Sequence, residues 1–246
     1  TLTDAAGSVT SYTYNARGQV LTITNPLNEV TTFTYDGNGY LTTVDSTLVG
    51  SADSITLTYD ALGRVRTTTN SDGYIRTYSY DDFDRVTQID YPDGTNEKIS
   101  YNKLDRATFT DRMNRVTSYT YDAVQQLTQV TDPLLRVIKT DWCRCGSLAS
   151  ITDPKGNMTR WRRDIQGRVT AKINADNSRV AYSYDSAGRM VMRTDEKGQN
   201  KLFDYFADDS VKQVSYPNAE VATASVFYDY DTNYDRMTSM RDGIGT

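Results

Sequence analysis

The stretch Tyr182–Met190, which reads YSYDSAGRM, contains the pattern that determines the fold of this 246-residue chain. Two large rings alternate with a small polar residue, which places Tyr182 and Tyr184 on one face of a β-strand. Asp185 can hydrogen-bond to the backbone two residues further on, and Gly188 tolerates a positive φ, so a tight turn is favoured there. An apolar residue then opens a second strand. The stretch therefore predicts a β-hairpin.

The same pattern returns about every 21 residues along the chain. Successive anchor residues are separated by 21, 24, 21, 21, 20, 21, 21, 21, 21 and 25 positions. The anchors are Tyr14, Tyr35, Tyr59, Tyr80, Tyr101, Tyr121, Trp142, Arg163, Tyr184, Tyr205 and Tyr230. Such self-similarity is typical of repeat proteins, whose units stack because each is too small to bury its own apolar face. We predict a single array over residues 1–246, with about eleven units and with both ends cut inside a repeat.

Each unit also contains turn residues and the start of a second strand. The turn residues that we single out are Gly18, Gly39, Gly63, Gly146, Gly167 and Gly188, together with Asp60 and Asp185. The apolar residue six positions after the anchor is Val20, Leu41, Val65, Val86, Leu127, Leu148, Val169, Met190 or Val211. No segment has the apolar spacing of a helix. We predict an all-β chain of about 22 strands, two for each anchor. Because large open sheets twist and curl, these tandem hairpins should form a long, curved antiparallel sheet.

The composition argues against several classes of protein. The chain has a formal net charge of −5 and a pI near 4.9, which disfavours binding to nucleic acid. It contains no His, the usual general acid or base and a common metal ligand. No apolar run approaches the roughly 18 residues that a membrane span needs. We therefore expect no catalytic residue, no cofactor, no nucleic-acid partner and no membrane span.

Cys143 and Cys145 are the weak candidates for a metal site. They lie in the segment Trp142–Gly146, where Cys143 occupies the place of the turn Asp. A Cys-x-Cys pair can be half of a zinc site, a disulfide, or simply two small residues in a turn. Two thiolates do not complete a tetrahedral site. The turn interpretation is preferred, and the disulfide and a shared metal remain alternatives.

Carboxylates and arginines cluster at the predicted turns. The segments Asp81–Asp84 and Asp229–Asp231 do not match calcium loops, and Asp already has a hydrogen-bonding role at a turn. A glycosidase that uses paired carboxylates is therefore a less favoured alternative. An Arg commonly follows the turn, as at Arg64 and Arg189. We expect these arginines to pair with turn carboxylates along the array.

The segments Tyr59–Val65 and Tyr184–Met190 resemble the YD repeat of bacterial Rhs proteins and animal teneurins, and the resemblance extends over essentially the whole chain. It implies a segment of a spiralling β-sheet wound into a hollow shell. In bacterial members such a shell encloses a C-terminal toxin, and in teneurins it serves cell-surface adhesion.

The resemblance also sets our functional expectations. We expect a structural segment of a shell that encloses a toxin or other cargo, in a large secreted or cell-surface protein of bacterial origin. The expected partners are the rest of the parent chain and the enclosed cargo. The alternative is an adhesion module that binds glycans or proteins through its tyrosine-rich faces. Open strand edges would make the isolated chain self-associate.

Overall fold

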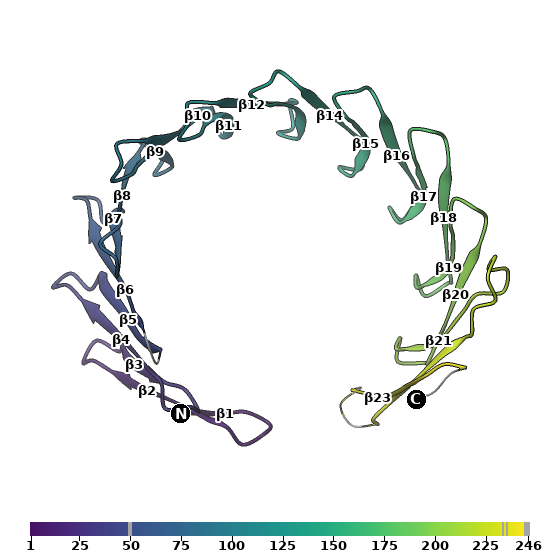
Figure 1. Cartoon of the computed structure of the whole chain (residues 1–246), viewed down its shortest axis with the longest axis horizontal. Helices are drawn as coiled ribbons and strands as arrows, with labels where there is room; N and C mark the ends of the chain where they lie inside the picture. Colours follow the sequence, from purple (N-terminus) through teal and green to yellow (C-terminus); the bar gives the residue numbers. More distant parts are fainter. Residues whose placement is uncertain (49–50, 233, 235, 244–246) are drawn as a thin grey trace. The chain divides into compact units, whose positions relative to one another are not determined.

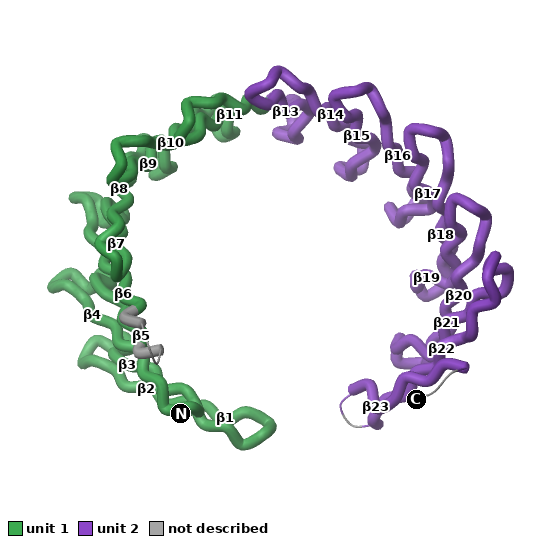
Figure 2. Tube along the Cα trace, in the orientation of Figure 1, with its two compact units in different colours: residues 1–119 green, residues 120–246 purple. Residues whose placement is uncertain are grey.

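The computed structural model describes residues 1–48, 51–232, 234 and 236–243, and all regular structure in these ranges is β-strand (Figure 1). The chain divides into two compact units, unit 1 with residues 1–119 and unit 2 with residues 120–246, each of which contains several repeats (Figure 2). In each unit every strand pairs in antiparallel fashion with its neighbours in sequence. The all-β, antiparallel fold class predicted from the hairpin pattern is thus confirmed. No helix that could span a bilayer occurs among the described residues.

Unit 1 is a ladder of hairpins in which each strand follows its partner directly in the chain. Its strands are β1 (Leu2–Thr3), β2 (Val9–Tyr14), β3 (Val20–Thr24), β4 (Val30–Tyr35), β5 (Leu41–Leu48), β6 (Ser51–Tyr59), β7 (Val65–Asn70), β8 (Ile75–Tyr80), β9 (Val86–Asp90), β10 (Asn96–Asn102), β11 (Asp105–Thr110) and β12 (Val116–Tyr121), the last of which ends just beyond the boundary. The hairpin of β5 and β6 has the longest strands, and it coincides with the 24-residue spacing between anchors.

Unit 2 repeats the same arrangement. Its strands are β13 (Leu127–Thr131), β14 (Val137–Trp142), β15 (Leu148–Thr152), β16 (Met158–Arg163), β17 (Val169–Ile173), β18 (Arg179–Tyr184), β19 (Met190–Thr194), β20 (Asn200–Tyr205), β21 (Val211–Ser215), β22 (Val226–Tyr230) and β23 (Met237–Arg241). All nine apolar residues that were predicted to open a second strand do so. The end of the expected last unit, residues 244–246, lies outside the described residues.

A bulge recurs at ten of the anchors. Ser183 pairs with Met192, but the next residue, Tyr184, pairs with Met190, so the second strand carries one extra residue. Ten described hairpins shift register in the same place. Bulges bend a strand and increase its right-handed twist. They account for the curvature that each unit shows by itself (Figure 2).

The sheet is a single layer with very little core. Among the described residues only Ala171, Val180, Val214 and Ser150 are buried. The accessible surface is 16464 Å² for 27.7 kDa, whereas a compact monomer of that mass exposes roughly 11,000 Å². The contacts that hold neighbouring repeats together must therefore lie within the sheet itself.

Candidate functional site: the anchor and turn ladder

The anchor tyrosines connect each 21-residue repeat to the repeat before it. The Tyr184 hydroxyl donates a hydrogen bond to the carbonyl of Val169, fifteen residues earlier, at 2.8 Å. The acceptor is the residue that opens the second strand of the preceding unit. The same bond joins Tyr35 to Val20, Tyr80 to Val65, Tyr101 to Val86 and Tyr205 to Met190, at 2.7 to 3.0 Å. Tyr59 reaches Leu41 at 2.7 Å, eighteen residues back, across the longer hairpin of β5 and β6.

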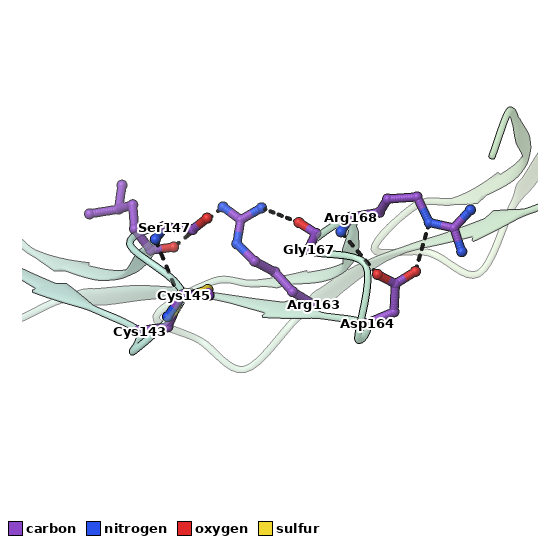
Figure 3. Close-up of a disulfide and its surroundings, with 8 residues drawn as sticks. Cys143, Cys145, Ser147, Arg163, Asp164, Gly167 and Arg168 are labelled. Atoms are coloured by element: carbon purple, nitrogen blue, oxygen red, sulfur yellow. Dashed lines mark hydrogen bonds and ion pairs between the residues drawn. A yellow bond between two sulfur atoms is a disulfide. The ribbon is translucent and has the colours of Figure 1, made fainter.

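Two anchors that are not tyrosines make the same link. The Trp142 indole N–H donates to the Leu127 carbonyl at 2.7 Å. The Arg163 guanidinium donates to the carbonyls of Leu148 at 3.4 Å and Gly167 at 3.1 Å (Figure 3). Arg163 was counted as an anchor by its spacing, but it was not among the residues predicted to form the ladder, that is, the series of anchor side chains that links neighbouring repeats. The available signal was a long side chain with N–H donors at the 21-residue position.

The remaining anchors, Tyr14, Tyr121 and Tyr230, lie at the strand ends where the repeat spacing predicts them, but no hydrogen bond of this kind is seen for them among the described residues. Tyr14 is 57% exposed and stacks on Tyr12 with ring centroids 6.5 Å apart. Tyr230 meets Phe206 edge to face at 6.2 Å. Tyr121 is half-buried at the end of β12.

The aspartate after the anchor organises the turn. Asp60 Oδ1 accepts hydrogen bonds from the backbone N–H groups of Leu62 at 2.9 Å and Arg64 at 3.0 Å, while Oδ2 accepts one from Arg64 Nε at 2.8 Å. Asp185 binds Arg189 in the same way. The guanidinium and the backbone N–H of Arg189 lower the pKa of the Asp185 carboxyl. The carboxylate thus stabilises the turn as an anion.

Several turn arginines also contact the next repeat. Arg64 donates to Asp84 Oδ1 at 2.8 Å, and its guanidinium lies over the Tyr80 ring at 4.7 Å. Arg189 bonds to Asp209 at 2.9 Å and lies over the Tyr205 ring at 4.9 Å. The predicted pairing of turn arginines with turn carboxylates along the array is confirmed at these positions.

The predicted turn glycines have the backbone conformation that they were expected to supply. Gly18, Gly39, Gly63, Gly146, Gly167 and Gly188 all have positive φ, from 77° to 93°. Gly63 is also needed for space, because a Cβ there would lie 2.2 Å from the Tyr40 hydroxyl oxygen. Tyr40 in turn stacks on Tyr59 at 4.8 Å. Residues with side chains occupy the equivalent position elsewhere, such as Gln125, which sequence reasoning did not predict.

A row of hydroxyl groups on the sheet in unit 1 was also not predicted. Thr13 bonds to Thr22, Thr58 to Thr67 and Ser100 to Thr108, each at 2.6 Å, and Thr34 bonds to Thr42 at 3.0 Å. In the first three pairs one residue immediately precedes an anchor and the other is its cross-strand partner. Thr34 also precedes an anchor, but its cross-strand partner is Thr43, the neighbour of Thr42. Their signal was the Ser or Thr that comes before almost every anchor tyrosine.

The weak metal candidates, Cys143 and Cys145, are joined by a disulfide, so the preferred interpretation of two unlinked turn residues is wrong and the disulfide alternative is the one that the structure shows. The residues that the structure describes contain no group of three or more His, Cys, Asp or Glu side chains that could hold a metal ion. The carboxylate clusters belong to turns or strand pairs. Asp81 binds Arg85, and Asp229 binds Ser239 and Arg241.

These contacts define a class of protein: a tandem β-hairpin repeat whose units are joined by side chain to backbone bonds. The chain belongs to the RHS Repeat family. The family model matches residues 1–29, 14–48, 59–95, 101–136, 146–178 and 166–199, more than half of the sequence.

Several known proteins are similar to this chain. Double-stranded DNA deaminase toxin A of Burkholderia cenocepacia is 26% identical over 155 residues, which cover 61% of this chain and 10% of that protein. The crystal structure of TcdB2-TccC3-TEV matches with a TM-score of 0.69 at 14% identity, over 95% of this chain and 15% of that one. The structure of a Photorhabdus luminescens Tc holotoxin pore matches with a TM-score of 0.60 at 13% identity, again over 95% and 15%. At these identities the solved structures show the fold alone. The chain spans only about a tenth to a seventh of the length of these proteins.

Proposed function

We propose that this chain is a structural segment of an RHS-repeat wall that encloses a C-terminal toxin or other cargo within a larger protein. The observation that carries the proposal is the single-layer sheet, which exposes both faces and has almost no core of its own. Such a sheet separates two spaces, and its stability comes from contacts along its length. Both properties suit a wall.

The relatives support the same role. The curated relative is named a toxin, and its similarity to this chain covers 10% of its length. One solved structure with the same fold is that of TcdB2-TccC3 without its hypervariable C-terminal region, with a TM-score of 0.66. In that structure the hypervariable C-terminal region is absent and this fold is present. A repeat wall with a separate C-terminal cargo fits these descriptions.

The alternatives have less support. An adhesion module would present its tyrosines to a ligand, but six anchor tyrosines direct their hydroxyl groups to backbone carbonyls. A glycosidase needs a free pair of carboxylates flanking the scissile bond. The turn aspartates Asp60, Asp81 and Asp185 are instead held by arginines. We therefore assign the ladder and turn residues a structural role.

Cryo-electron microscopy of the full-length protein that contains this chain tests the proposal. We expect the repeats to surround a cavity that contains additional density. A matched protein that lacks its C-terminal segment should give the same wall with that density missing. An open array without enclosed density, or density bound to the outer face, would contradict enclosure.

We further propose a secreted or cell-surface location for the parent protein, and self-association of the isolated chain. The self-association follows from the end strands, because β1 and β23 each present a strand edge in addition to the one paired with β2 or β22. Light scattering coupled to size-exclusion chromatography should show oligomers that increase with concentration. A monomer at high concentration would count against open edges.

A further inference from the structure

The disulfide lies in a turn that normally holds an anion. Cys143 stands where the other turns have Asp, and its Sγ accepts hydrogen bonds from the backbone N–H groups of Cys145 at 3.2 Å and Ser147 at 3.4 Å (Figure 3). Asp60 Oδ1 accepts the equivalent two bonds, from the residues two and four positions later. The sulfur of Cys143 thus occupies a carboxylate oxygen position.

The turn at Asp153 shows what this arrangement does to an anion when no arginine is the partner. Asp153 Oδ1 accepts bonds from the N–H groups of Lys155 and Asn157, both at 2.8 Å. The Asn157 side-chain amide and the Asn157 backbone N–H, with a smaller contribution from Lys155, lower the pKa of the Asp153 carboxyl. Two convergent N–H donors favour the charged form of an acceptor. A thiolate at Cys143 would receive the same two donors.

The two sulfurs are not equivalent. Cys145 is exposed at the turn, whereas Cys143 is half-buried. Of the two sulfurs, only Cys143 Sγ accepts hydrogen bonds from backbone N–H groups of the turn. Two arginines belong to this region: Arg144 lies between the two cysteines in sequence, and Arg163 on β16 bonds to the carbonyls of Leu148 and Gly167 (Figure 3). Asp164 on the following turn is paired with Arg168.

From this asymmetry we infer that Cys143–Cys145 is a thiol–disulfide exchange site that accepts a low-molecular-weight thiol at Cys145. The incoming thiolate attacks Cys145 Sγ and forms a new sulfur–sulfur bond. The Cys143–Cys145 bond breaks, and its electron pair leaves on Cys143 as a thiolate held by the N–H groups of Cys145 and Ser147. One disulfide replaces another, so no external oxidant is required. A leaving thiol with a lower pKa leaves faster, which directs attack to Cys145.

Trapping of the mixed disulfide tests the direction of attack. The full chain is incubated with reduced glutathione, quenched with iodoacetamide and digested, and the adducts are located by mass spectrometry. We expect glutathione on Cys145 and the alkyl group on Cys143, in several-fold excess over the reverse. In denaturant the excess should disappear, because the turn is lost. Equal labelling of the two cysteines, glutathione mainly on Cys143, no adduct at all, or an excess that persists in denaturant would overturn the inference.

The single-cysteine variants provide a second measurement. In Cys145→Ser the Cys143 thiol keeps its two N–H donors, and in Cys143→Ser the Cys145 thiol has none of them. The pH at which iodoacetamide alkylation is half-maximal should therefore be lower for Cys145→Ser by about one pH unit, which corresponds to a tenfold difference in ionisation. The midpoint for Cys143→Ser should lie near the ordinary thiol value of about 8.5. Equal midpoints for the two folded variants would refute the role of the turn.

Discussion

Removal of one anchor hydroxyl should weaken the link between two neighbouring units. In Tyr184→Phe the ring remains under the guanidinium of Arg168, which lies 4.7 Å from its centroid, but the 2.8 Å hydrogen bond to the Val169 carbonyl is lost. A hydrogen bond contributes about 1 kcal/mol net, and a carbonyl left without its partner costs about 1–3 kcal/mol when it is buried. Because this site is only half-buried, we expect a loss of about 1–2 kcal/mol.

Native-state hydrogen exchange is the appropriate assay, because a repeat chain need not unfold in one cooperative step. A loss of 1–2 kcal/mol corresponds to exchange that is about 5–30 times faster. The acceleration should be confined to β17–β19 and the turns beside them. Tyr14→Phe is the matched control, since Tyr14 is 57% exposed and stacks on Tyr12. The control should change stability by less than about 0.5 kcal/mol. Unchanged exchange in Tyr184→Phe, or an equal effect in Tyr14→Phe, would refute the ladder.

The other predictions concern the turns; the changes in stability can be checked by native-state hydrogen exchange of the hairpin concerned, and the pH dependence by acid unfolding. Gly63→Ala should lose about 1–3 kcal/mol more stability than Gly156→Ala. The new Cβ would lie 2.2 Å from the Tyr40 hydroxyl oxygen at position 63, whereas it would have no neighbour within 4 Å at position 156. Equal losses in the two variants would exclude a clash. Leu135→Gly should stabilise the chain by about 0.5–1 kcal/mol, because an exposed leucine with a φ of 61° has a strained backbone. A destabilised variant would argue against that strain. The pKa of Asp185 is lower in the folded chain than its ordinary value of 3.8, so its stabilising contribution is present above that pH and is lost as the pH falls through the folded value. Asp185→Asn should therefore make the acid-induced fall in the unfolding midpoint shallower, and an unchanged pH profile would contradict this role.

Most of the fold could be predicted from the repeat alone. The alternating rings, the Asp and Gly of the turn, and the apolar residue six positions after the anchor together locate both strands of each hairpin. The sequence could not indicate which carbonyl each anchor binds, because that depends on how the bulge orients one hairpin against the next. The longer reach of Tyr59 to Leu41 shows this dependence.

The turn position with positive φ was predicted less completely. Glycine marks it at Gly63 and Gly188, but Asp84, Gln125 and Leu135 adopt the same conformation with a side chain. Hydrogen bonds across the turn and pairing of the flanking strands impose the conformation there, and these outweigh the local preference of the residue. Similarly, Arg163 forms the link that tyrosine forms elsewhere. The requirement is a donor of the right length, which a pattern search for tyrosine does not detect.

The nearest-neighbour pairing of strands has a consequence for how the chain is made. In each unit a strand pairs with the strand that the ribosome has just completed. The loops to be closed are short, so their entropic cost is small and contacts can form quickly. Each finished hairpin has an open strand edge with which the next hairpin can pair, so the order of synthesis is also the order of assembly.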